Sequence, residues 1–243
     1  MNNSKRQDRE SSILIMQSSY IPWIGFYSML THCESLVILD DVQFDKGGWR
    51  NRNYIISNST KKLLTVPILQ SNLAKLNTIE IDNSQNWQNK HLETIRHSYC
   101  KGGSDLNFYN SMKALLAKDF SKLLELNSEF LRLSFQTLGL HPDCFFSSQL
   151  SQIEEKNLRL VKMMKLLGKS TYLTGPAGLD YLDLDLFKRA KLRVKVFEFD
   201  ESVTYPQSSE TFIPKLSIID YILNMENKSQ EPSLREFGEF RLV

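Results

Sequence analysis

Short apolar runs alternate along this chain with longer stretches whose apolar residues have helical spacing. Residues 13–16 (ILIM) and 36–39 (LVIL) are continuous apolar runs with the length of buried strands. Residues 22–31, which lie between them, have the spacing of a short helix. A strand, a helix and a second strand in this order form a βαβ unit, and such a unit predicts a parallel sheet.

Beyond Trp49 the pattern predicts a hairpin, a group of helices and a return to strands. Residues 53–57 and 63–67 are strand-like and flank a polar turn, which is typical of a hairpin. Helices are predicted at 87–99, 106–117, 120–138 (ending at Gly139), 154–167, 184–190 and 216–224, the last followed by a polar tail. Further strands are predicted at 79–82, 145–148, 171–176 and 194–199.

The order of these elements predicts one α/β domain over residues 13–243. Its core is expected to be a parallel, Rossmann-like sheet, with a helical insertion at about residues 87–138. The chain has no internal repeat and no low-complexity linker that would divide it further. Residues 1–12 are polar and lack the apolar segment of a signal peptide, so we expect a disordered leader there.

Composition and charge exclude several classes of function. The 243 residues are 41% hydrophobic and 24% charged, as in ordinary soluble globular proteins. The formal net charge is only +2 and there is no block of Lys and Arg, so no patch for nucleic acid is expected. No apolar run approaches the roughly 20 residues of a membrane-spanning helix, so no membrane segment is expected.

The cysteines and histidines have no spacing typical of a metal site. The three cysteines include no CxxC pair, which also argues against a disulfide framework. His91 and His97 are six residues apart, and this is not a same-face spacing on a helix. We therefore expect no metal site and a cytoplasmic location, and the sequence identifies no cofactor.

Two carboxylates follow the second predicted strand. Asp40 and Asp41 would lie at the carboxyl end of a parallel strand, where open α/β sheets bind their ligands. A carboxylate there could act as a general base on an amine or bind a divalent ion, or it could simply cap a helix or turn. Gln43 follows in the same segment and is a candidate for binding substrate.

Two arginines and two asparagines alternate at residues 50–53. The guanidinium groups of Arg50 and Arg52 are forked donors suited to phosphate or carboxylate. In an extended segment Arg50 and Arg52 share one face while Asn51 and Asn53 share the other, so one pair would face a ligand. The alternative is an exposed strand that carries surface charges.

Aromatic and turn residues add further candidates. Tyr20, Trp23 and Trp49 could stack on a base or a sugar ring, or they could pack in the core. His91, within a helical pattern, is a candidate catalytic base. Gly175 follows a predicted strand in a turn that suits close approach of a ligand, although turn geometry alone also explains a glycine there.

Five segments carry a recognisable set of motifs: QSSYIPWIGF at 17–26, ILDDVQF at 38–44, WRNRN at 49–53, LTVP at 64–67 and the KHL-containing helix at 87–99. Together they resemble the WbqC-like family, and the resemblance covers about residues 13–224. The family's first His is Met16 here and its Pro-Asn pair is Ser18-Ser19, so roles tied to those residues do not transfer. Tyr205 and Gln207 are similar to the family's Y-x-Q element.

The resemblance implies a role in the synthesis of O-antigen or another surface polysaccharide. The expected function is transfer of an N-acyl or aminoacyl group from a donor to a nucleotide-linked amino sugar. A non-catalytic nucleotide-sugar binder or scaffold, and an ATP-dependent amide ligase, are the alternatives. The expected catalytic residues are Asp40, Asp41 and His91, and the expected substrate-binding residues are Gln17, Tyr20, Trp23, Gln43, Trp49, Arg50, Asn51, Arg52, Asn53, Gly175 and Gln207.

The first predicted unit is also similar to the nucleotidylyltransferase arrangement. In those enzymes a first strand leads to an H-x-G-H motif at the start of a helix. Trp23 and Phe26 occupy the two histidine positions here, which excludes adenylyl transfer by imidazoles. A nucleotidylyltransferase-like fold without that chemistry is therefore one form that the predicted core could take.

Overall fold

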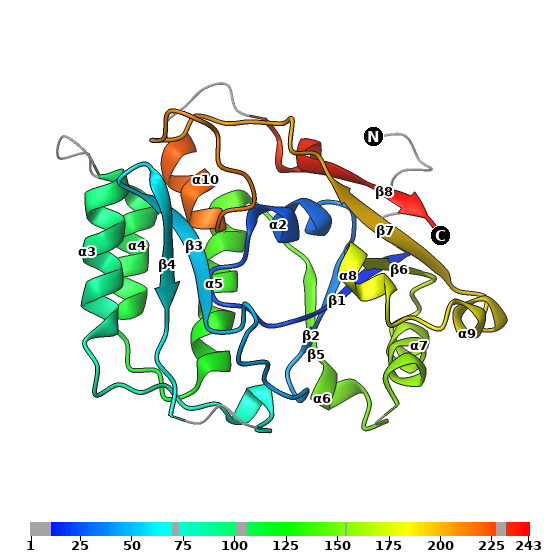
Figure 1. Cartoon of the computed structure of the whole chain (residues 1–243). Coiled ribbons are helices and arrows are strands. Elements are labelled where there is room, and N and C mark those ends of the chain that lie inside the picture. The colour runs from blue at the N-terminus through cyan, green and yellow to red at the C-terminus, as the bar shows by residue number, and fades with distance from the viewer. Residues whose placement is uncertain (1–10, 70–72, 101–105, 154, 227–231) are drawn as a thin grey trace.

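A six-stranded sheet with the strand order β5-β2-β1-β6-β7-β8 forms the centre of the molecule (Figure 1). The computed structural model describes residues 11–69, 73–100, 106–153, 155–226 and 232–243. The first five strands in this order are parallel, and β8 is antiparallel to β7. The strands are β1 (Ser12–Gln17), β2 (Ser35–Leu39), β5 (Asp143–Phe146), β6 (Thr171–Thr174), β7 (Arg193–Phe199) and β8 (Gly238–Leu242).

The strand order confirms the predicted parallel, Rossmann-like α/β core. β1 lies inside the sheet and pairs with β2 on one side and with β6 on the other. The chain thus moves outward from β1 in both directions, which is the doubly wound arrangement. The predicted βαβ unit is confirmed, because β1 pairs with β2 in parallel register from Ile13↔Ser35 to Gln17↔Leu39.

Apolar layers cover both faces of the sheet. Successive strand residues point to opposite faces, so Leu14 lies in the larger apolar cluster and Ile13 and Ile15 lie in the smaller one. Burial on both faces explains why the strands are continuous apolar runs. The larger cluster contains residues of α2 (Ile24–Leu30), α5 (Leu123–Leu138) and α10 (Ile218–Met225), and the smaller contains residues of α7 (Lys156–Leu166) and α9 (Leu184–Arg189).

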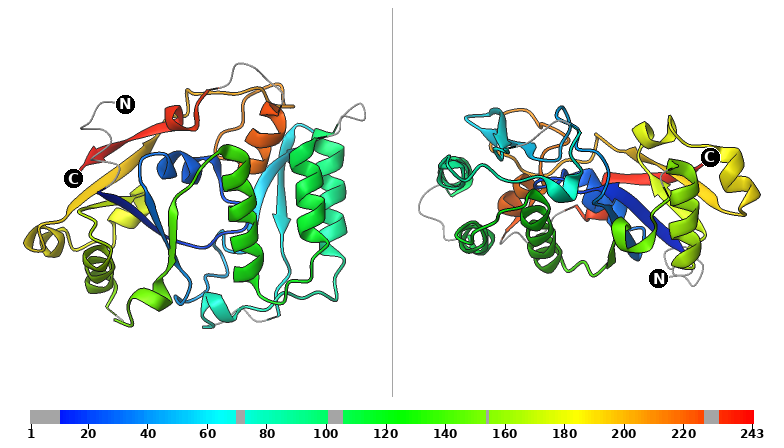
Figure 2. Two further views of the ribbon diagram at one scale, coloured as in Figure 1. Left: turned by 180° about the vertical axis from the view of Figure 1, so that it is seen from behind. Right: turned by 90° about the horizontal axis from the view of Figure 1, so that it is seen from below.

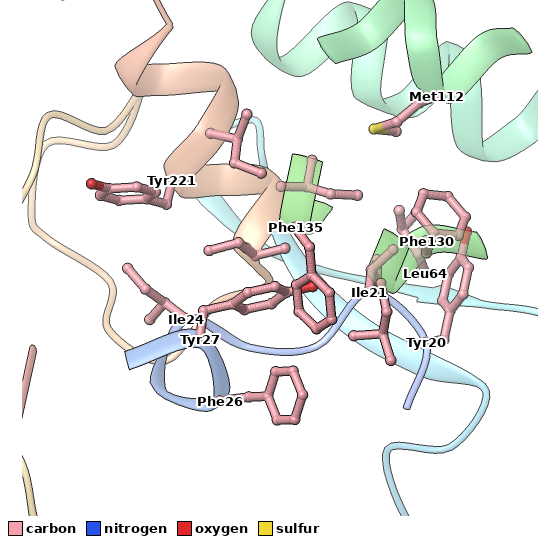
Figure 3. Packing of buried hydrophobic residues seen from close by; sticks show 14 of the residues in the cluster. Tyr20, Ile21, Ile24, Phe26, Tyr27, Leu64, Met112, Phe130, Phe135 and Tyr221 are labelled. Carbon is pink, nitrogen blue, oxygen red and sulfur yellow. The ribbon is translucent and has the colours of Figure 1, made fainter. Parts of the chain in front are cut away.

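A hairpin and two further helices extend the larger layer. β3 (Arg52–Ser57) and β4 (Thr60–Thr65) pair in antiparallel register, so the predicted hairpin is confirmed. Leu64 of the hairpin packs in one cluster with residues of all three helices of the predicted insertion. Figure 3 shows Leu64 with Met112 and Phe130 of this insertion. Figure 2 shows the first two helices of the insertion at the opposite end of the molecule from α7 and α9. The two additional helices are α3 (Trp87–Tyr99) and α4 (Asn107–Leu116).

Two predicted segments differ from the structure. Residues 79–82 form no strand, because Ile81 and Glu80 make only single bridges, to Ile68 and Lys122, and no neighbouring strand continues a ladder. The polar tail contains β8, which the sequence did not reveal because Gly238–Leu242 is short and has little apolar character. Of the predicted leader, residues 1–10 lie outside the described residues, and β1 already begins at Ser12. Short elements complete the chain: α6 (Ser147–Leu150), α8 (Pro176–Leu179) and the 3-10 helices at Leu76–Thr78 and Leu234–Phe237.

A fully buried carboxylate connects α10 to the insertion. Asp220 accepts hydrogen bonds from the hydroxyls of Tyr99 (2.6 Å) and Tyr205 (2.7 Å) and from the amide of Gln207 (2.9 Å). Burial raises the pKa of Asp220, and these donors act against the increase. The network therefore joins α10, α3 and the segment after β7 through one side chain.

Asp220→Ala tests the contribution of this network to stability. Loss of the carboxylate leaves three buried donors without their acceptor, so the free energy of unfolding should fall by about 2–4 kcal/mol. Urea denaturation followed by circular dichroism measures the change. Asp119→Ala, which removes an exposed carboxylate, is the control and should leave the midpoint nearly unchanged. Equal effects of the two substitutions would show that the network contributes nothing.

Candidate functional site

The chain leaves β1 through a strained turn. Ile21 is buried and has a φ of 40°, a backbone conformation that is costly for a β-branched residue. Its carbonyl accepts hydrogen bonds from Asn53 Nδ2 and Ser217 Oγ, both at 2.9 Å. Segments from β3 and from the start of α10 therefore hold the turn in place. Such strain persists only where the surrounding structure fixes it, and it is concentrated at functional sites.

Next to this turn lies a small pocket of about 80 Å³. Its position at the carboxyl ends of β1 and β2 is where doubly wound sheets bind ligands. Most of its wall is apolar, with a few polar side chains near the turn. The pocket is lined by Met16, Gln17, Ser18, Ser19, Pro22, Trp23, Phe26, Leu36, Ile38, Trp49, Arg50, Asn53 and Leu131.

Arg50 is the cation of this pocket. Its Nη1 donates to the Ser18 carbonyl (3.2 Å) and to Ser19 Oγ (3.1 Å). Nε is buried without a hydrogen-bond partner, and Nη2 makes no hydrogen bond with the described residues. In the part of the chain that is described, Arg50 forms no ion pair with a carboxylate. The edge formed by Nε and Nη2 thus suits bidentate binding of a carboxylate or phosphate.

The environment of Arg50 weakens its hold on its proton but leaves it charged. Burial lowers the pKa of Arg50 to about 10, and the charge of Asp45 acts in the opposite direction. A buried cation without a contacting anion costs free energy, and an anionic ligand would recover part of that cost. The Ser18 hydroxyl is a second buried polar group of this pocket without a hydrogen-bond partner.

The backbone of Arg50 is held from two sides. Its carbonyl accepts hydrogen bonds from the Tyr20 amide and from Asn127 Nδ2, both at 3.0 Å. Asn127 is fully buried on α5, among the leucines and phenylalanines of that helix. We did not identify Asn127 from the sequence, although a polar residue on an otherwise apolar helical face is a signal that it has a structural partner.

Two indoles border the pocket. The ring of Trp23 lies directly over Gly25, where a Cβ atom would come within 2.1 Å of it. Trp23 also contacts Phe199, with 5.1 Å between ring centroids. Trp49 is 47% exposed and lies beside Tyr54, at 5.7 Å. An aromatic border of this kind can stack on a sugar ring or a base.

The alternation expected for residues 50–53 is not observed. β3 begins only at Arg52, so Arg50 lies before the regular strand and its side chain is free of the strand's alternation. Arg52 donates to the carbonyls of residues 46–48, and Asn51 Nδ2 donates to the Val66 carbonyl at 2.8 Å. The pocket therefore brings together Arg50 and Asn53, whereas Arg52 and Asn51 hold neighbouring backbone.

Asp40 and Asp41 lie outside the lining of the pocket and join β2 to the segment after β5. Asp40 accepts hydrogen bonds from the Ser148 hydroxyl (2.7 Å) and amide (2.9 Å). Asp41 accepts from Ser147 Oγ (2.6 Å) and forms an ion pair with Arg159 Nη2 at 2.6 Å. Burial raises the pKa of Asp41, but the hydrogen bonds from Ser147 and Arg159 outweigh it and lower the pKa. Such a carboxylate is a weak general base.

His91 belongs to an aromatic cluster of the core. Its Nδ1 lies 3.0 Å from the Tyr20 hydroxyl, and its ring packs against Trp87 at 5.3 Å. Tyr20 in turn packs against Phe130 of α5 at 5.4 Å (Figure 3). Burial lowers the pKa of His91 to about 4, so the imidazole is neutral at pH 7.

The other predicted site residues lie away from the pocket. Gln43 is exposed, and Gln207 belongs to the Asp220 network. Gly175 precedes α8, and a Cβ atom there would meet nothing within 4 Å. The described residues include no group of three His, Cys, Asp or Glu placed to hold a metal ion. Within the same residues, no helix has the length and apolar character needed to cross a membrane.

The buried His91 predicts a pH-dependent loss of stability. The unfolded chain binds a proton near pH 6.5, whereas the folded chain resists protonation until about pH 4, so stability should fall as the pH decreases through this interval. In His91→Gln this component is absent, and its size is on the order of 3 kcal/mol at pH 4. Urea denaturation at several pH values measures it. The exposed variant His97→Gln should keep the wild-type pH dependence; the same dependence in His91→Gln would contradict the prediction.

The contact between Trp23 and Gly25 predicts the effect of a small substitution. Gly25→Ala favours the helix by about 1 kcal/mol, yet its Cβ would overlap the indole and force Trp23 to move. We expect altered tryptophan fluorescence with α2 intact by circular dichroism. Gly175→Ala adds the same methyl group in open space and should leave the spectrum unchanged. An unchanged spectrum in Gly25→Ala would mean that the indole does not lie against this glycine.

Comparisons with known proteins agree with the motifs in this region. A model of the WbqC-like protein family matches residues 17–231. The chain is also similar to the uncharacterized protein Rv1507c of Mycobacterium tuberculosis, with 26% identity over 216 residues that cover 88% of this chain and 93% of that protein. No solved structure matches the chain. Because the family model spans most of its length, the chain belongs to the WbqC-like protein family.

Proposed function

We propose that this protein acts in the synthesis of a surface polysaccharide by binding a nucleotide-linked sugar at Arg50. The proposal rests on one observation: the Nε and Nη2 atoms of Arg50 have no hydrogen-bond acceptor among the described residues. A phosphate oxygen pair matches the spacing of these two donors. The resemblance of the chain to the WbqC-like family implies a role in O-antigen synthesis, and this supports a sugar as the rest of the ligand.

The surroundings of Arg50 support such a ligand further. Trp23 and Trp49 offer flat apolar faces on which a sugar ring or a base can stack. Gln17 lines the same pocket, and its side-chain amide can donate to and accept from sugar hydroxyls. The strained turn at Ile21 supports a functional role for this part of the chain.

Transfer of an acyl or aminoacyl group to the amine of this sugar is the second candidate function. The apolar floor of Met16, Leu36 and Ile38 favours it, because an acyl group could lie there. The sugar amine would attack the acyl carbonyl, and the donor's leaving group would depart while the amine proton passes to a base. Among the bases proposed from the sequence, Asp41 is weakened by its ion pair with Arg159 and His91 is buried.

Mass spectrometry separates the two candidates. Incubation with nucleotide-linked amino sugars and acyl or aminoacyl donors yields a heavier sugar if transfer occurs. Binding without any change of mass would leave a nucleotide-sugar binder or scaffold. Consumption of ATP on adding an acid and an amine would instead identify an amide ligase. Trp23 and Phe26 argue against that class, because they replace the two histidines of the H-x-G-H motif.

Substitution of Arg50 tests the proposed binding. Calorimetry with a panel of nucleotide-linked amino sugars should give a measurable affinity that falls at least tenfold in Arg50→Gln, because the bidentate contact is lost. Arg50→Lys keeps the charge but lacks the forked pair of donors, so its affinity should lie between those of the wild type and Arg50→Gln. The control Arg96→Gln removes an exposed arginine of α3 and should bind as the wild type does. The proposal fails if no member of the panel binds, or if Arg50→Gln binds equally well.

A further inference from the structure

An apolar groove runs between α5 and the edge strand β5. Its volume is about 450 Å³, more than five times that of the Arg50 pocket. Two basic residues, Arg132 and His141, belong to its wall, and Arg132 is paired with Glu129 at 2.9 Å. The remaining wall is largely apolar: Ile38, Ser128, Leu131, Phe135, Gln136, Leu140, Pro142, Cys144 and Phe146.

The groove adjoins the Arg50 pocket. Ile38 of β2 and Leu131 of α5 line both, one from the sheet and one from the helix. Small-molecule sites usually have volumes of about 300–1,000 Å³. The Arg50 pocket alone is far smaller than this, whereas the groove falls within the range. A larger ligand that contacts Arg50 would have to extend past Ile38 and Leu131 to use the groove.

We infer that the groove binds the acyl chain of an N-acylated nucleotide-linked sugar, one phosphate of which contacts Arg50. This inference rests on the proposed function and names the class of its ligand. Arg50, a cation without a contacting carboxylate, lines the pocket, and the apolar wall of the groove begins at Ile38 and Leu131, which the pocket and the groove share. A ligand with an anionic group and a hydrocarbon chain matches both parts, whereas an unsubstituted sugar phosphate leaves the apolar part exposed to water.

A series of ligands with increasing chain length tests the inference. The probes are glucosamine 1-phosphate, which is the sugar phosphate portion of such a ligand, and its N-acetyl, N-octanoyl and N-dodecanoyl derivatives, each titrated calorimetrically below its micelle concentration. Affinity should rise roughly threefold to fourfold for each methylene that enters the groove, and then level off when the groove is filled. An affinity that does not depend on chain length would overturn the inference.

Ser128→Phe fills the groove from α5 and supplies the matching variant. Ser128 donates only to the Leu124 carbonyl of its own helix, so the substitution removes no contact between elements. The control Ser111→Phe alters an exposed serine of α4 with the same kind of bond, to Asn107, outside the groove. Ser128→Phe should abolish the gain from longer chains and keep the affinity for glucosamine 1-phosphate, while Ser111→Phe keeps both. Cys144→Trp on the opposite wall should repeat the result if Ser128→Phe fails to fold.

The outcomes separate this inference from the proposed function. Loss of phosphate binding in Arg50→Gln together with no effect of chain length would support the proposed function and overturn the groove. A chain-length effect that Arg50→Gln leaves intact would overturn the phosphate contact and retain the groove as an acyl site. A dimer in sedimentation that Ser128→Phe dissociates and Ser111→Phe does not would show that a second copy covers the groove, against the inference.

Discussion

The carbonyl of Ile21 holds the site together. It accepts hydrogen bonds from Asn53 at the start of the hairpin and from Ser217 at the start of α10. These two bonds compensate a costly backbone conformation at a buried β-branched residue. They also join segments that are far apart in the sequence to the end of the central strand. The conformation of this turn positions Ser18, Ser19 and Trp23 beside Arg50 in the pocket.

This constraint explains how a charge is kept inside the protein. Arg50 is held through its own carbonyl by Tyr20 and Asn127 and through Nη1 by the turn. The side chain cannot easily swing into solvent, so the cost of its burial is part of the folded state. The large shared core, in which the hairpin, α3, α4 and α5 pack in one cluster with α2, stabilises the fold against that cost. A binding site that is prepared in this way loses little entropy when its ligand arrives.

Much of the fold follows from local patterns. The continuous apolar runs of β1 and β2 are buried on both faces of the sheet. The helical spacing at residues 87–99 coincides with α3. The errors occur where the pattern is weak. β8 pairs with β7, a strand distant from it in the sequence, whereas residues 79–82 alternate like a strand but find no partner for a ladder. Pairing between distant segments is invisible to a local pattern.

For the site, the sequence alone marked the two segments, residues 17–26 and 49–53, that supply much of the pocket lining at the end of β1. It did not determine their contacts. Arg50 and Arg52 look equivalent in the sequence, yet one lines the pocket and the other holds backbone carbonyls. Asp41 looked available as a base, but Arg159 contacts it from 118 residues away. Hydrogen bonds and ion pairs are satisfied in three dimensions, and only the tertiary structure decides which polar groups already have a partner.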